Sequence, residues 1–278
     1  MGFAFSPNLK ANVFEAVRLS SSLGKSLYFL HVGKKTQKKE EKFKSILQEA
    51  PKGSNTIKTI WKEGAPVDVI TSECNKNHID LLLLGALQRE NVLKFYLGSI
   101  ARKLTRKAPC SVFLMIKPSI QYLNPNHMVV NALKSNQTEI TINAAFVYAK
   151  ALNIPNITLV DEINQSEVAV NVDDDSSLKK ATLRKKELNK EEDVRLSEIL
   201  MGVSKSLISN KNIKSQHIFG TRGYSISHYA KVVRADILVI NSEEKRSYFL
   251  RRLFPKDLDY ILSELPTDVL IIKSNQDG

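Results

Sequence analysis

The chain has 278 residues, enough for two domains of ordinary size, and its 42% hydrophobic content excludes an intrinsically disordered protein. No apolar run approaches the length of a membrane span, and two cysteines are too few for a disulfide framework or a typical zinc site. We therefore expect a cytoplasmic protein without membrane insertion. The net charge of +12 is uneven, because residues 1–120 hold 20 basic against 9 acidic residues. We interpret this excess as a solvated lysine surface, since no stacking aromatics alternate with the basic residues as nucleic-acid binding would require.

Strand and helix patterns alternate through the first 120 residues. Apolar residues at helical spacing predict a helix over 9–23, and Pro66 suits the first turn of a later helix. Apolar runs and alternating residues predict strands over 26–32, 56–61, 80–84 and 111–116. This alternation indicates βαβ units and a parallel sheet.

Residues 80–107 combine a strand, a glycine loop and a helix. The strand ends at Gly85, and Gly98 and Ser99 open the helix. Parallel α/β proteins bind phosphate at such a connection, because unpaired N–H groups and the helix dipole face the anion. The alternative is an ordinary strand-to-helix connection in which Ser99 caps the helix.

After a linker over 118–126 the pattern starts again, with a strand, a helix and a second strand over 128–160. A polar and charged insert follows over about 161–210, and its spaced leucines predict one or two amphipathic helices. Three adjacent carboxylates, Asp173 to Asp175, lack the spacing of a calcium loop. We interpret them as an acidic helix N-terminus.

An internal repeat of about 156 residues relates the two halves. When Gly64 is placed over Gly220, Asp80 falls on Asp236 and the apolar run 81–84 falls on 237–240. A period of this length is too long for a solenoid and indicates a duplicated domain.

These blocks resemble the universal stress protein family, with its domain present twice, over 1–120 and 121–278. The resemblance rests on FSPN, SLYFLHV, DLLLLG, the Gly-Ser pair and APCSVFLMIK, and on ADILVIN and LPTDVLIIK in the second half. It implies an α/β fold of two doubly wound, parallel, five-stranded sheets with strand order 3-2-1-4-5. Ligands in such sheets bind at the topological switch point, here near Ala4 and Gly85. It also implies that the two domains form a pseudo-twofold pair through their last strands; a homo-oligomer or a separate protein partner are further alternatives.

The resemblance also implies which residues would contact a nucleotide. ATP-binding members have two glycines three residues apart and, after nine more residues, a Gly-Ser or Gly-Thr pair. Here the spacing is kept, but Gln88 takes the place of the middle glycine, and Ala4 takes the place of an acidic residue that contacts the nucleoside. The candidate binding residues in the first domain are therefore Gly85, Gly98, Ser99 and Val32.

In the second domain, Asn241 replaces the first glycine and Pro255 lies where the Gly-Ser pair would be. Proline has no N–H to offer an anion. We expect no ATP site in this domain, and at most a weakened nucleotide or anion site in the first.

The sequence contains no recognisable catalytic set and no metal-ligand spacing, so we expect no catalytic residues and no metal. We interpret His31 as structural or as lining the cleft. The preferred hypothesis is a non-catalytic stress-response or signalling protein that acts as a binding or interaction module, with an eroded ATP site. One alternative is binding of ATP, another nucleotide or an anion in the first domain, with slow hydrolysis and with Arg102 or Lys103 neutralising phosphate. A second is a regulatory partner of a transporter or nucleic acid that uses the basic first domain.

Overall fold

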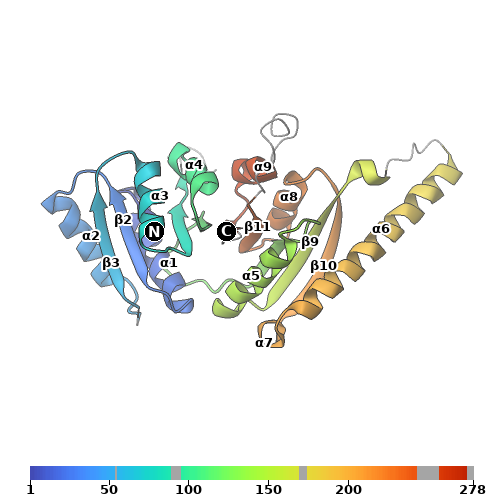
Figure 1. Cartoon of the computed structure of the whole chain (residues 1–278), viewed down its shortest axis with the longest axis horizontal. Helices are drawn as coiled ribbons and strands as arrows, with labels where there is room; N and C mark the ends of the chain where they lie inside the picture. The colour runs from blue at the N-terminus through green and yellow to red at the C-terminus, as the bar shows by residue number, and fades with distance from the viewer. Residues whose placement is uncertain (54, 89–94, 169–173, 243–256, 274–278) are drawn as a thin grey trace. The chain divides into compact units, whose positions relative to one another are not determined.

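The computed structural model describes residues 1–53, 55–88, 95–168, 174–242 and 257–273 (Figure 1). The chain packs into two compact units. Unit 1 comprises Met1–Pro125, Ala151–Asn153 and Thr267–Gly278, and unit 2 comprises Asn126–Lys150 and Ile154–Pro266. Among the described residues, no helix combines the length and the apolar character needed to cross a membrane.

Unit 1 contains the elements that alternating patterns predict. Its strands are β1 (Gly2–Phe3), β2 (Leu27–Val32), β3 (Ile57–Lys62), β4 (Leu81–Gly85), β5 (Leu87–Gln88), β6 (Phe95–Tyr96), β7 (Ser111–Met115) and β12 (Asp268–Ile272). Its helices are α1 (Leu9–Ser22), α2 (Gln37–Glu49), α3 (Pro66–Lys76) and α4 (Ser99–Lys107). Local chemistry sets several ends: the Thr36 hydroxyl accepts from the Lys39 N–H at the start of α2, and Pro66 occupies the first turn of α3.

The strands of unit 1 do not form one five-stranded sheet. The first three pair in parallel as β1-β2-β3, with Phe3 opposite His31 and Leu27 opposite Ile57. A second group has β4 parallel to β7 and β12 antiparallel to β7, with Val269 opposite Leu114.

The two groups of strands in unit 1 are separated between β1 and β4. β1 has only two residues, and its Gly2 lies beside the Leu84 and Ile70 side chains without a ladder to β4 among the described residues. A two-residue strand offers too few N–H and C=O groups for two ladders.

Unit 2 has the expected strand order in its parallel strands. They are β8 (His127–Asn131), β9 (Asn156–Asn164), β10 (Asn212–Gly220) and β11 (Ile237–Asn241), in the order β10-β9-β8-β11. This is the predicted 3-2-1-4 arrangement. The helices are α5 (Thr138–Ala151), a 3₁₀ turn η1 (Gln165–Val168), α6 (Asp175–Gly202), α7 (Lys205–Ile208), α8 (Tyr224–Val232) and α9 (Asp257–Glu264).

The prediction of two separate five-stranded sheets is therefore wrong in detail. The described strands form one sheet of three, one of seven and a two-stranded hairpin, β5 with β6. The α/β class and the parallel βαβ connections are confirmed.

Most of the charged insert forms a long helix, α6, which runs alongside β10 (Figure 1). It begins as predicted at the acidic cluster, because the Asp174 carboxylate accepts from the Ser177 N–H at 2.7 Å while the Ser177 hydroxyl accepts from the Asp174 N–H at 3.0 Å. Further along, Leu188 is buried against Ile163, Val168 and Phe219. The insert is thus a surface helix with one apolar face on the sheet.

Candidate functional site

A cavity of about 310 Å³ lies in unit 1 at the carboxyl ends of β1, β2 and β4. It is where the switch point was predicted, and it brings together five residues that sequence reasoning singled out. These are Ala4, Val32, Gly85, Gly98 and Ser99. They come from four different elements or loops, so the fold and not the sequence neighbourhood assembles the cavity.

The walls of this cavity are mainly apolar. The described residues that line it include no lysine, arginine, aspartate or glutamate, and many of them are aliphatic: Leu9, Leu30, Ile70, Leu84, Leu87 and Leu104. Arg102 and Lys103 lie on α4 but are not among these lining residues. The expected phosphate partners are therefore outside the cavity, and the cavity fits a ligand with little charge.

The N-terminus of α4 contributes positive potential to the cavity. Gly98, rather than Ser99, is the N-cap, and no side chain caps the helix. A Cβ on Gly98 would lie 3.2 Å from Leu87 Cδ1, so the missing side chain permits this close approach. Ser99 and the next two residues line the cavity in the first turn, where free N–H groups and the helix dipole favour one anionic or hydrogen-bond-accepting group.

Two buried polar side chains of the cavity lining have unpaired atoms. Asn12, on α1, lies against Gly85, where an added Cβ would be 2.7 Å from both terminal atoms of the Asn12 amide. Within the described structure, Asn12 Oδ1 and His31 Nε2 have no hydrogen-bond partner. His31 Nδ1 lies 3.1 Å from the Phe3 carbonyl oxygen, which can only accept, so Nδ1 carries a proton in this contact; in that tautomer Nε2 is an acceptor. Unpaired buried acceptors are costly, and a ligand donor would relieve that cost.

Three further positions, which the family's glycine loop singles out, are not among the described residues that line the cavity. Gln88 lies in β5, and its side chain is outside the description; Pro255 lies outside the described residues altogether. Asn241 ends β11 in unit 2, where its amide donates to the Ser135 hydroxyl at 3.3 Å. The side chain that replaces the family's glycine therefore ties β11 to the loop after β8.

Strand register identifies the unit 2 counterpart of the cavity. Phe3 faces His31 in unit 1, and Asn131 faces Val160 in unit 2. Ala132 then corresponds to Ala4, and Asp161 corresponds to Val32. An apolar cavity residue in unit 1 is thus matched by a carboxylate in unit 2.

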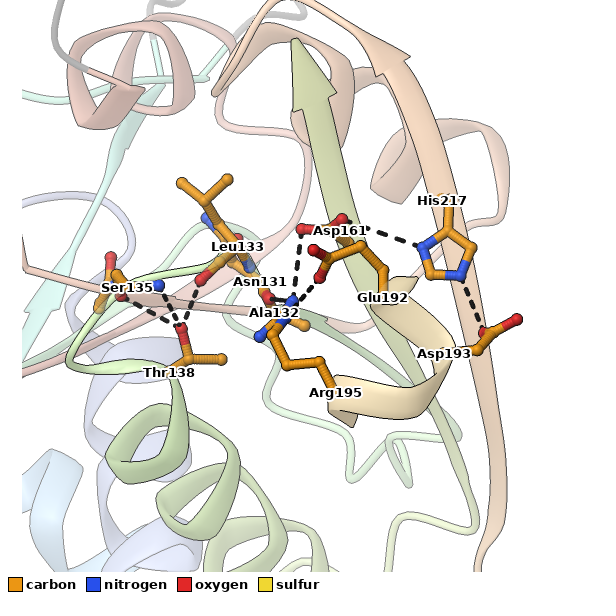
Figure 2. Close-up of polar contacts among 11 residues, drawn as sticks. Asn131, Ala132, Leu133, Ser135, Thr138, Asp161, Glu192, Asp193, Arg195 and His217 are labelled. Carbon is orange, nitrogen blue, oxygen red and sulfur yellow. Dashed lines mark hydrogen bonds and ion pairs between the residues drawn. The ribbon is translucent and has the colours of Figure 1, made fainter. Parts of the chain in front are cut away.

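An arginine from α6 fills this position in unit 2 (Figure 2). Arg195 Nη2 donates to the Ala132 carbonyl at 2.7 Å and lies 3.6 Å from Asp161 Oδ1, while Arg195 Nε contacts the Glu192 carboxylate. Burial first, and then the nearby Glu192 carboxylate, raise the pKa of Asp161 to about 6, against the opposing effect of Arg195, His217 and Arg222. The guanidinium is therefore shared between two carboxylates and a carbonyl.

A histidine completes the cluster on the β10 side (Figure 2). His217 Nε2 lies 2.9 Å from Asp193 Oδ1, and Nδ1 lies 3.9 Å from Asp161 Oδ2. The loop after β8 is held by its own side chains, since the Thr138 hydroxyl donates to the Leu133 carbonyl and accepts from the Ser135 N–H. Side chains of the chain itself thus occupy the end of β8.

Sequence reasoning missed Asp161, Arg195 and a second buried acid, Glu162. The Glu162 carboxylate accepts from the Gly223 and Ile226 N–H groups at 2.9 and 2.8 Å, which caps the start of α8. These partners lie more than 30 residues apart. The one available signal was a pair of acids at the end of an apolar strand.

Comparison with known proteins agrees with this geometry. Residues 6–115 match the model of the universal stress protein family. The likeness in sequence to this family thus lies within the first half of the chain. A universal stress protein of Methanocaldococcus jannaschii is 28% identical over 79 residues, which span 28% of this chain and 46% of that relative, so the chain covers less than half of its length.

Solved structures extend the likeness to the whole chain. A universal stress protein from Archaeoglobus fulgidus is 12% identical, with a TM-score of 0.64 and coverage of 100% of this chain and 96% of that one. A second from Pseudomonas aeruginosa, described as putative, is 15% identical, with a TM-score of 0.61 and coverage of 94% and 87%. At these identities the likeness concerns the fold, which is that of a tandem universal stress protein.

Proposed function

We propose that this protein works as a non-catalytic, cytoplasmic binding module in stress response or signalling, and that the unit 1 cavity holds its ligand. One observation carries the proposal: no charged side chain is among the described residues that line the cavity, although Gly85, Gly98 and Ser99 are all present there. A triphosphate would enter without side-chain counter-charges. The ATP site is eroded in this sense, while the cavity itself is kept.

The polar atoms of the cavity lining support a particular kind of ligand. His31 Nε2 and Asn12 Oδ1 are buried acceptors, and the first turn of α4 offers N–H donors. The aliphatic walls suit a flat or branched apolar body. We infer a compact ligand with donor groups, an apolar core and no more than one anionic group.

Calorimetric titration of the full chain with adenosine, Mg·ATP and inorganic phosphate tests this proposal. Adenosine, which is neutral and carries donor groups, should bind more tightly than Mg·ATP. Ala101→Phe, which fills the cavity from α4, should abolish the heat of adenosine binding. Lys103→Ala on the same helix is the matched control and should leave the heat unchanged. Tighter binding of Mg·ATP would favour the alternative of a nucleotide site with slow hydrolysis.

A regulatory partner of a transporter or nucleic acid is the second candidate function. The excess of 20 basic over 9 acidic residues in 1–120 favours it. A structure described as the cytoplasmic domain of a prokaryotic cation chloride cotransporter shares the fold at 11% identity and a TM-score of 0.50. Binding to anionic lipid vesicles or to nucleic acid should weaken steeply with salt, and a salt-independent isotherm would contradict this electrostatic mode.

We further propose that the two repeated domains are joined through their last strands. The antiparallel pairing of β12 with β7 supports this, as does the Ile116 N–H, which donates to the Asp268 carboxylate at 2.8 Å. Hydrogen exchange should then protect the Leu270 and Phe113 amides together. Fast exchange at residue 270 in the folded chain would contradict the pairing.

A further inference from the structure

The chain has two cysteines, Cys74 and Cys110, and both lie in unit 1. Both thiols are free, and the two residues are only 5% and 4% exposed. Neither is among the described residues that line the unit 1 cavity. A buried cysteine by itself behaves as a small apolar residue, so its neighbours decide whether it has any chemistry.

Strand register places Cys110 on the face of the sheet that α3 covers. In the parallel ladder of β4 and β7, Leu84 pairs with Leu114. Residues an even number of positions apart in a strand share a face, so Leu84, Leu114 and Cys110 point the same way. That face is turned towards α3, because Leu84 Cδ2 and Ile70 Cδ1 meet over one point: they would lie 3.5 and 3.4 Å from a Cβ on Gly2.

The helix α3 brings Cys74 to the same face, on the side away from the cavity. Cys74 lies one turn after Ile70, so the two side chains share one side of the helix. The helix ends shortly after Cys74, and β4 begins at Leu81, which pairs with Ser111, the residue that follows Cys110. The two cysteines therefore meet where β4 and β7 begin.

The two thiols interact directly. The hydrogen bond with Cys110 lowers the pKa of Cys74, against the opposing effect of burial, and the same hydrogen bond together with burial raises the pKa of Cys110. One thiol of the pair thus loses its proton first, while the other keeps its own. A thiolate beside a thiol is what disulfide formation needs, because the thiolate is the nucleophile and the second sulfur completes the bond.

We propose that Cys74 and Cys110 are a reversible redox site, at which hydrogen peroxide converts the two thiols into one disulfide. The Cys74 thiolate attacks one peroxide oxygen: the S–O bond forms, the O–O bond breaks, and the leaving hydroxide takes up a proton to become water. Cys110 then attacks the sulfenic sulfur of Cys74, so that the S–S bond forms and the second water leaves with the Cys110 proton. Two electrons pass from sulfur to oxygen, and one peroxide and two thiols give one disulfide and two waters.

Burial determines which oxidants reach this site. Both residues are almost fully covered, so the oxidant must be little larger than a water molecule. Hydrogen peroxide meets this condition and glutathione disulfide does not. The disulfide would close a loop over residues 74–110 and tie the end of α3 to the start of β7, which restricts the unfolded chain.

Peroxide treatment of the folded full chain tests the proposal. Thiol titration in guanidinium should find both cysteines before treatment and neither afterwards, and a phosphine reductant should restore both. The mass of the monomer should fall by about 2 Da, for the two hydrogens lost. The midpoint of thermal unfolding should rise by at least about 5 °C in the oxidised chain. Glutathione disulfide at the same concentration should oxidise the pair at least about tenfold more slowly.

Cys74→Ala and Cys110→Ala are the matched control variants, because each leaves one thiol in the same buried place. Circular dichroism should report an intact fold, and each remaining thiol should be lost at least about tenfold more slowly than the wild-type pair. Wild-type thiols that survive peroxide would overturn the proposal, and so would single variants that react as fast as the pair. A disulfide found only between two chains, or only in protein unfolded beforehand, would also overturn it.

Discussion

The carboxyl ends of the strands in unit 1 and unit 2 differ in what occupies them. In unit 1, Ala4 and Val32 border an apolar cavity. In unit 2 the corresponding Ala132 and Asp161 are bonded to Arg195, which the inserted α6 brings in. The same fold therefore forms a cavity in one copy of the domain, and fills the equivalent place with its own side chains in the other. A helix distant in sequence can thus occupy the end of a strand with its own side chain.

The largest effect should come from removing the arginine. Arg195→Met leaves Asp161, whose side chain is 4% exposed, without its closest positive partner. We expect a loss of about 3 to 5 kcal/mol in the free energy of unfolding of unit 2 at pH 8, as for other broken buried ion pairs. Urea unfolding followed by hydrogen exchange in β8 and β9 measures this loss.

Asp161→Asn added to Arg195→Met is the control for that experiment. The double variant should recover most of the lost stability, since no uncompensated charge remains buried. An Arg195→Met protein as stable as the wild type would show that the Arg195–Asp161 pair contributes nothing to stability, and would remove the contrast between the two units.

The second largest effect is a pH dependence of the free energy of unfolding of unit 2. The pKa of Asp161 is raised from 3.8 to about 6, so the folded state favours the protonated acid. Protonated Asp161 therefore stabilises the folded state fully below pH 3.8, and this stabilisation is lost as the pH rises through about 6. The free energy of unfolding should fall by about 3 kcal/mol between pH 4 and pH 8. Asp161→Asn should flatten this part of the stability profile. A difference between the two proteins that grows towards acid would contradict the sign.

The smallest expected effect is the loss of stability when the first glycine position of the loop, Gly85 in unit 1 and Asn241 in unit 2, is changed to alanine. Gly85→Ala in unit 1 would place a Cβ 2.7 Å from the Asn12 amide, so we expect a destabilisation of about 1 to 3 kcal/mol that Asn12→Ala partly reverses. Asn241→Ala in unit 2 loses one exposed hydrogen bond at 3.3 Å and should cost about 0.5 kcal/mol. Thermal unfolding of the three variants distinguishes these sizes, and equal costs at the two positions would show that the loops do not differ.

Several features of the fold could be predicted from the sequence because short-range patterns determine them. The apolar run at 81–84, the proline at the start of α3 and the acidic start of α6 all depend on neighbours a few residues away. The repeat then fixed the duplicated α/β architecture. The sheet division was not predictable, because it depends on how far the two-residue β1 can pair beside β4.

By itself, the sequence determined the order of elements, the tandem arrangement and the location of the glycine loop, including the replacements at Ala4 and Gln88. Only the tertiary structure decided what lies at each strand end: Asn12 against Gly85 in unit 1, and Arg195 beside Asp161 in unit 2. The physical reason is one of distance along the chain. Periodicity and capping act between near neighbours, whereas these contacts join residues 34 to 73 positions apart, whose meeting depends on strand register and on the packing of a whole helix.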